Sequence, residues 1–176
     1  MFNRKNYLKG FTLIELLIVI AILGVLAVVV LVAINAVQQL ARTRDAGRKS
    51  SVAQIGHAVA AYYTARNGAY PPVATWSTEL GPTGSGELSN IPAEVAYAVS
   101  GTAACTTNVI NGTWCYNMTA GTNAIVSARL ESNAEISKCT SGNAYFVYSV
   151  TEGRAGLICS ASEPGVSATM TWNAVQ

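Results

Sequence analysis

The chain contains little charge, one histidine and no recognisable catalytic motif. Charged residues make up 11% of the 176 residues, and His57 is the single histidine. We find no motif for a nucleophile, a metal or a phosphate, and the sparse acids form no Asp-rich calcium loop. The sequence therefore favours a protein that is not an enzyme, and it predicts no cofactor and no metal.

The most apolar segment begins shortly after Lys9. Every residue from Leu16 to Ile34 is aliphatic, alanine or glycine. As a helix this run is about 28 Å long, which is close to the ~30 Å hydrocarbon thickness of a bilayer, so we expect a membrane-spanning helix. Glu15 directly precedes the run, and a carboxylate there is costly unless it finds a partner. Glu15 is thus either functional or solvated by headgroups.

The residues before this run do not form an ordinary secretory signal. Arg4, Lys5 and Lys9 make a short basic leader, but no Ala-x-Ala cleavage site follows between residues 20 and 40. Any processing is therefore expected before the apolar run.

The segment Gly10–Glu15, with the sequence GFTLIE, resembles the class III signal of type IV pilins and type II secretion pseudopilins. The resemblance implies that prepilin peptidase cleaves between Gly10 and Phe11, removes residues 1–10 and methylates the new amino terminus of Phe11. The apolar helix would then remain on the mature protein.

The same resemblance implies how subunits assemble. Glu15 would pair with the Phe11 amine of a neighbouring subunit, which favours one axial stagger between helices, and Thr12 would belong to the same assembly site. Gly24 is a point of helix flexibility or close helix contact. Many members carry a proline in the apolar segment, but residues 11–70 contain none.

The resemblance also implies an α+β fold, in which a long N-terminal α-helix packs on a C-terminal antiparallel β-sheet. Helical spacing continues beyond the membrane, because Val52, Ile55, Val59, Tyr62 and Tyr63 form one stripe. The expected parts are a cleaved leader (1–10), a transmembrane or assembly helix (11–35), its amphipathic continuation (36–67) and a globular sheet with disulfides (68–176).

Two local patterns refine the helical part. Asn67-Gly68 and the prolines after it predict a helix end near Arg66. A helix from Phe11 to that point would be about 84 Å long, which is too long for one head domain to cover and therefore favours polymerisation. Asp45 and Lys49 are spaced for a helix ion pair, but we expect this charged turn to be solvated.

The rest of the chain is rich in short β-type runs. Residues 73–93 are expected to form an exposed loop with little burial, and Thr151–Arg154 a hairpin turn. The expected strands are Val95–Val99, Trp114–Met118, Ala124–Leu130, Tyr145–Val150, Gly156–Cys159 and Ala168–Trp172.

All four cysteines follow the apolar run, and none forms a Cys-x-x-Cys pair. This pattern predicts a head domain outside the cytoplasm with two disulfides. Three pairings are open, of which Cys105–Cys115 with Cys139–Cys159 closes the shortest loops and is favoured.

The leading hypothesis is a structural subunit of a type IV pilus-like filament. It would be a single-pass precursor in the inner membrane and a surface pilus after assembly, serving adhesion, twitching motility or DNA uptake. Its partners would be copies of itself, prepilin peptidase, the inner-membrane assembly platform and minor pilins.

Other functions remain open. Within the family the alternative is a pseudopilin of a type II secretion system. In another class, the chain would be a monomeric membrane-anchored receptor, and a membrane-tethered enzyme ranks third. No specific nucleic acid is predicted, because cleavage after Gly10 leaves 8 Lys and Arg against 9 Asp and Glu, a net charge of −1.

Overall fold

The computed structural model describes residues 10–33, 35–93, 95–98, 109–110 and 114–173. The chain divides into two compact units, before and after the bond between Val37 and Gln38. The first unit contains helix α1 (Leu13–Ala33), and the second contains nearly all of α2 (Ala36–Ala65) and every later element.

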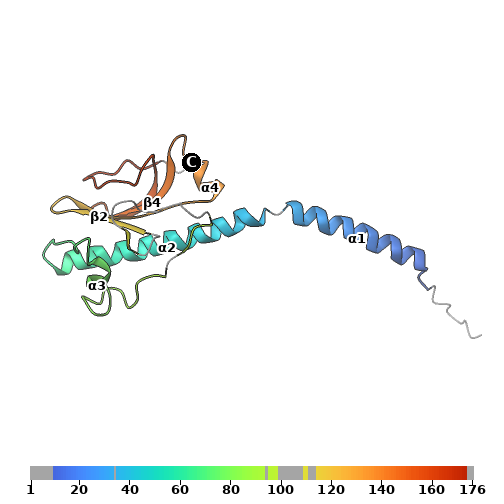
Figure 1. Cartoon of the computed structure of the whole chain (residues 1–176), viewed down its shortest axis with the longest axis horizontal. Helices are drawn as coiled ribbons and strands as arrows, with labels where there is room; N and C mark the ends of the chain where they lie inside the picture. The colour runs from blue at the N-terminus through green and yellow to red at the C-terminus, as the bar shows by residue number, and fades with distance from the viewer. Residues whose placement is uncertain (1–9, 34, 94, 99–108, 111–113, 174–176) are drawn as a thin grey trace, which may run out of the picture. The chain divides into compact units, whose positions relative to one another are not determined.

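Figure 1 shows helix α1 in blue. It has apolar side chains on all of its faces. Its segment Leu13–Leu31 has a mean hydropathy of 3.2 and is long and apolar enough to cross a membrane, and none of it is buried in the structure. A helix that is apolar all round needs lipid or other apolar helices around it. The expected N-terminal apolar helix is therefore present.

Helix α2 is amphipathic, as its sequence predicted. Val52, Ile55, Val59 and Tyr62 are buried, and the opposite stripe is exposed. The placement of Tyr63 in the buried stripe is wrong, because this residue is 37% exposed. The helix ends where predicted, because Asn67 (φ 52°) and Gly68 (φ 85°) adopt the left-handed conformation that terminates helices. Together α1 and α2 account for the expected long N-terminal helix. The sequence did not predict that Asn35 would lie outside both helices.

Five antiparallel strands form one sheet in the order β1-β2-β3-β4-β5. Four of them match expected strands, which confirms the α+β fold class, and β4 and β5 are joined by the predicted turn. The predictions at Val95–Ala98 and Ala168–Trp172 are wrong, because neither segment is a strand, and Val99 lies outside the described residues. The strands are β1 (Val109–Ile110), β2 (Trp114–Thr119), β3 (Asn123–Arg129), β4 (Asn143–Ser149) and β5 (Arg154–Ser160).

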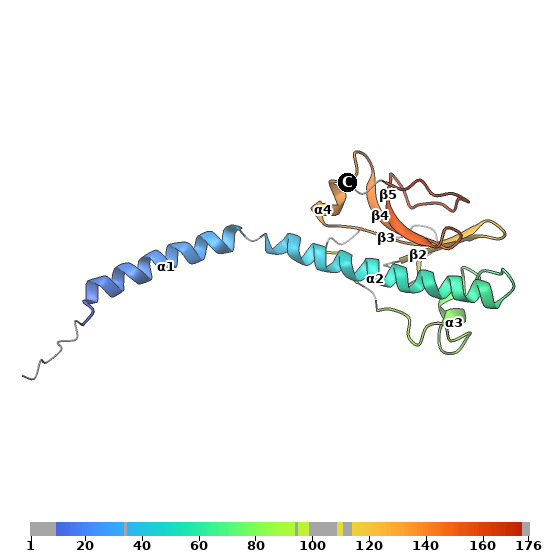
Figure 2. The same cartoon turned by 180° about the vertical axis from the view of Figure 1, so that it is seen from behind.

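Alternation along the strands gives the sheet two apolar faces. One face packs against α2, and its cluster joins Val52 and Val59 to Trp114, Val126 and Tyr148. The other face carries a separate cluster of Ile125, Tyr145, Val147 and Ile158, covered by Met170 and Trp172. Figures 1 and 2 show α2 along one side of the sheet and the dark-red C-terminal segment on the side away from α2.

The connection from α2 to the sheet is better packed than expected. It contains a short helix, α3 (Trp76–Leu80), whose two terminal side chains are buried in the core together with Leu88. The expectation that residues 73–93 would form a loop with little burial is therefore wrong. Large apolar side chains at Trp76, Leu80 and Leu88 fold this segment onto the core that α2 and β2 share.

Candidate assembly site and the charged network of the head

The proposed cleavage point lies in backbone that precedes α1. Gly10 and Phe11 are both outside the helix, which begins at Leu13, and the Phe11 side chain is 80% exposed. The bond between these two residues is thus in non-helical, exposed chain. That geometry suits a peptidase, because the bond is accessible and lies outside regular secondary structure.

Thr12 and Glu15 are brought together by the first turn of α1. The Thr12 amide and the Thr12 hydroxyl both donate to Glu15 Oε2, at 2.9 and 2.7 Å, and the Glu15 amide donates to Thr12 Oγ1 at 3.3 Å. The Thr12 carbonyl accepts the first bond of the helix, from the Leu16 amide. Thr12 is therefore the N-cap of α1, and the pair forms a reciprocal capping box.

The capping box fixes where the Glu15 carboxylate points. Thr12 occupies Oε2, whereas Oε1 accepts no hydrogen bond from any residue in the described part of the chain. An ionised carboxylate has about four acceptor positions, so Glu15 retains capacity for a further donor. The sequence signal for this arrangement is Thr-x-x-Glu before an apolar run. The expected partners of Glu15 were a neighbouring subunit or the lipid headgroups, and this internal contact was missed.

Gly24 lies inside α1, which is helical on both sides of it. A Cβ atom added at Gly24 would meet no atom within 4 Å, so the fold of this subunit does not require a glycine there. A shallow apolar groove surrounds the position, lined by Ile20, Ala21, Gly24, Val25, Val28 and Val29. Helix flexibility at Gly24 stays a prediction.

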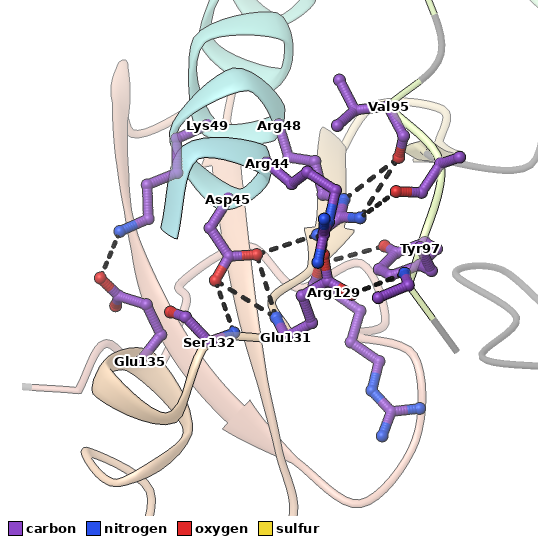
Figure 3. A network of polar contacts seen from close by, with 12 residues as sticks. Arg44, Asp45, Arg48, Lys49, Val95, Tyr97, Arg129, Glu131, Ser132 and Glu135 are labelled. Atoms are coloured by element: carbon purple, nitrogen blue, oxygen red, sulfur yellow. Dashed lines mark hydrogen bonds and ion pairs between the residues drawn. The ribbon is translucent and has the colours of Figure 1, made fainter. Parts of the chain in front are cut away.

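The second charged feature is a buried ion pair on α2 (Figure 3). Asp45 is 2% exposed and Arg48 is 0% exposed, and Arg48 Nη1 lies 2.9 Å from Asp45 Oδ1. The Asp45 carboxylate also accepts the amide hydrogens of Glu131 and Ser132, at 3.0 and 2.8 Å. Asp45 thus holds the backbone turn that leads from β3 into α4 (Asn133–Ile136).

Arg48 joins the same helix to another segment. Its Nη2 donates to the carbonyl oxygens of Val95 and Ala96 at 3.3 and 2.9 Å, and its guanidinium carbon lies 3.7 Å from the ring centre of Tyr97. The Tyr97 hydroxyl in turn donates to the Arg129 carbonyl at 3.0 Å. Burial raises the pKa of Tyr97 to about 12, although the Arg48 charge acts to lower it.

Glu131 completes this network. It forms ion pairs with Arg44 and with Arg48, and its Oε2 accepts the Ala98 amide at 3.0 Å. Burial acts to raise the pKa of Glu131, but the contacts with Arg44, Ala98 and Arg48 outweigh it and hold the pKa below its ordinary value. At neutral pH the carboxylate is therefore charged and holds two arginines of α2.

Lys49 belongs to a neighbouring contact. Its Nζ lies 2.6 Å from Glu135 of α4, and Lys138 lies 3.1 Å from the same carboxylate. Burial acts to raise the pKa of Glu135, and the two lysines lower it by more. The charged turn of α2 is therefore not solvated, which corrects the sequence prediction: Asp45 and Lys49 each bind a different part of the head.

The structure contains the disulfide Cys139–Cys159, one of the two bonds favoured from loop length. It links the chain after α4 to the end of β5, with a Cα–Cα distance of 5.5 Å. Cys115 is buried in β2, but Cys105 lies outside the described residues, so the Cys105–Cys115 bond stays a prediction.

No cluster of three or more His, Cys, Asp or Glu within the described ranges is arranged to hold a metal ion. His57 is exposed on α2, and its Nδ1 lies 3.2 Å from the Tyr148 hydroxyl. The acidic side chains of the network are occupied by arginine, lysine and backbone amides. The arrangement is therefore one of structural attachment between helix and sheet.

These features fit a membrane-anchored, pilin-like precursor, with an exposed segment before a capped apolar helix and an α+β head. Residues 5–31 match a family model described as the prokaryotic N-terminal methylation motif. The motif implies processing by prepilin peptidase and assembly into pilus-like filaments, and the proteins that carry it are structural. No curated protein and no solved structure matched the chain in the other two comparisons.

Proposed function

We propose that this chain is the structural subunit of a type IV pilus-like filament that is built from the inner membrane and displayed on the cell surface. Prepilin peptidase would cut between Gly10 and Phe11 and methylate Phe11. Copies of the mature chain would then assemble on the inner-membrane platform, together with minor pilins. The filament would serve in adhesion, twitching motility or DNA uptake.

The observation that carries this proposal is the exposure of the apolar side chains of α1. Its large aliphatic side chains are about half exposed or more, from Leu13 at 81% to Val19 at 46%. Burying each such side chain is worth about 1.5–3 kcal/mol, so the helix is stable only in lipid or among other apolar helices. A filament core of sister helices provides the second environment when the subunit leaves the membrane.

Glu15 supplies the register for that assembly. Its Oε2 is held by Thr12 of the same chain, and the unoccupied capacity at Oε1 suits a donor from outside. The methylated amine of Phe11 on a neighbouring subunit is a cation that cleavage itself creates. In an apolar bundle each of these charges is costly alone, so the pair favours the one stagger that brings them together.

The proposal is tested on material sheared from the surface of cells that express the chain. Mass spectrometry of the N-terminus should find methylated Phe11, and electron microscopy with peptide identification should find the chain in filaments. Functional protein that keeps Met1–Gly10 and stays monomeric in the membrane would overturn the proposal in favour of an anchored receptor. Methylated Phe11 in filaments confined to the periplasm would instead indicate a secretion pseudopilin.

A further inference from the structure

The second apolar face of the sheet is covered by the end of the chain. Residues 161–173, called here the C-terminal strap, follow β5 and contain no helix or strand. Val166, Met170 and Trp172 of the strap pack on Ile125 and Val147 of the sheet. This cluster is separate from the main core, which lies on the other face of the sheet against α2.

Among the described residues, separate hydrogen bonds hold the strap, one of them from the Asn143 side-chain amide to the Ala161 carbonyl at 3.4 Å. The Asn173 amide donates to the Leu157 carbonyl of β5 at 2.9 Å, and the Ser167 carbonyl accepts the Asn123 side-chain amide at 2.8 Å. Near the start of the strap, Glu163 accepts the Asn117 side-chain amide at 2.7 Å. Most of these bonds use side chains, so the strap is attached at points and does not extend the sheet.

Glu152 is the principal attachment point. It lies in the turn between β4 and β5, where Oε1 accepts the Met170 amide at 2.5 Å and Oε2 accepts the Trp172 indole hydrogen at 2.6 Å. Arg154 is the charged group that faces it: Nε lies 3.1 Å from Oε2, and the guanidinium carbon lies 4.5 Å from the Trp172 ring centre. One carboxylate thus holds two residues of the strap.

Gly156 leaves the space that the Trp172 ring occupies. A Cβ atom placed on Gly156 would lie 2.7 Å from Trp172 Cε3, closer than two carbon atoms can approach without a shift. The indole therefore packs against Gly156 of β5 only because that residue has no side chain.

Two surface cavities border the C-terminal strap. One cavity lies between the strap and the end of β5, near Cys159 and Ser160, and a second lies between the strap and the end of β2, near Asn117 and Thr119. Both are open to solvent, so water reaches the strap from either side. The strap is consequently held by Glu152 and by the packing of Val166, Met170 and Trp172 on the sheet.

We propose that the C-terminal strap is a detachable cover latched by Glu152, which leaves the sheet as a unit while the α2 side of the head stays folded. Detachment bares the apolar face formed by Ile125, Tyr145, Val147 and Ile158. The two clusters share only the sheet between them, so loss of the strap removes packing from one face and leaves the other face complete. Local opening of this kind requires less free energy than global unfolding.

Hydrogen exchange of the full-length protein in detergent micelles at neutral pH tests the latch. Glu152→Ala should speed exchange at the Met170 and Asn173 amides about tenfold or more, because hydrogen bonds to a charged group are lost. Exchange in β3 and β4 should stay at the wild-type rate. Glu87→Ala, which removes an exposed carboxylate in the 81–93 segment, is the matched control and should change neither region.

Gly156→Ala provides a second route to the same state, because it displaces Trp172 without altering Glu152. It should give the same pattern of faster exchange in the strap alone. The proposal is overturned if strap exchange is unchanged in both variants. It is also overturned if strap and β3–β4 exchange accelerate by the same factor, since the head would then open only as a whole.

Discussion

Arg48 Nη1 lies 2.9 Å from Asp45 Oδ1 on the preceding turn of α2, and neither side chain is accessible to solvent. Each of these charges would be unstable in the interior without the other. Both also bind backbone: Asp45 accepts two amides after β3, and Arg48 donates to the carbonyls of Val95 and Ala96. Arg48 lies 3.2 Å from Glu131 as well. The pair therefore attaches α2 to two parts of the head at once.

Asp45→Ala should be strongly destabilising. The substitution removes the nearer carboxylate of buried Arg48, which keeps only Glu131 at 3.2 Å. It also leaves the Glu131 and Ser132 amides without their acceptor. Breaking a buried pair typically costs about 3–5 kcal/mol, and we expect a loss toward the lower end of that range because Glu131 remains. Urea unfolding of the full chain in detergent, followed by circular dichroism, measures the change. Arg42→Ala, an exposed site on the same helix, should stay within about 0.5 kcal/mol of wild type. If Asp45→Ala lowered the free energy of unfolding no more than Arg42→Ala does, the Asp45–Arg48 pair would contribute nothing to stability.

Acid should weaken the same attachment through Glu131. Its pKa is lowered from 4.5 by its partners, so its contribution to the free energy of unfolding is complete above about pH 4.5 and is lost as the pH falls through the lowered pKa. Glu131→Gln should be less stable than wild type at neutral pH and should lose less on acidification. Unfolding curves from pH 7 to about pH 2.5 test this, with Glu87→Gln as the control. A slope as steep as in wild type would contradict the assignment.

The sequence predicted those parts of the fold that depend on local patterns. The buried stripe of α2, its end at Asn67-Gly68 and four strands follow from periodicity and turn residues, which act over a few positions. The roles of Asp45 and Glu152 were missed for a different reason. The partners of Asp45 lie 86 and 87 residues away, and Ala168–Trp172 alternates like a strand although Glu152 and Gly156 hold it instead. Contacts between distant segments leave no periodic signal.

The same difference between local patterns and distant contacts applies to the assembly site and to the charged network. The class III motif predicts the cleavage point and the role of Glu15 from adjacent residues, because a peptidase signal is short and linear, and both stay predictions. The Thr12–Glu15 contact is equally local, and the capping-box spacing contains it. The tertiary contacts of Arg44, Arg48 and Lys49 on α2 could not be seen in this way, because their partners are distant in sequence. Glu131, which binds the two arginines, follows β3, and Glu135, which binds Lys49, lies in α4.

Two glycines of α2 should respond in opposite ways to alanine. At Gly56 a Cβ would lie 2.3 Å from the Tyr148 ring, so Gly56→Ala forces β4 and α2 apart and should destabilise by about 1–3 kcal/mol. At Gly47 a Cβ would make an ordinary 3.4 Å contact with Val95, so Gly47→Ala should stabilise by up to about 1 kcal/mol through helix propensity. Thermal unfolding compares the two variants directly. A change in stability of the same sign in both would contradict the prediction.

The Glu15 carboxylate should be needed for assembly and not for membrane insertion. Glu15→Ala removes a costly charge from the edge of the apolar run, so membrane insertion should be unchanged or improved, while ordered filaments should be lost. The measurements are the membrane fraction of the precursor and the yield of sheared filaments. Wild-type filament yield from this variant would refute the pairing between subunits.

Variants of Thr12 test whether the orientation of the Glu15 carboxylate matters for assembly, while its charge is kept. Thr12→Val keeps the shape of the side chain but removes the hydroxyl that donates to Glu15 Oε2 at 2.7 Å, whereas Thr12→Ser keeps it. If the capping box aims the carboxylate, filament yield should fall with valine and recover with serine, while cleavage after Gly10 is unaffected. Thr43→Val is the matched control, because the Thr43 hydroxyl only donates to the Gln39 carbonyl of its own helix. Equal yields from Thr12→Val and Thr43→Val would mean that Glu15 finds its neighbour without help from the cap.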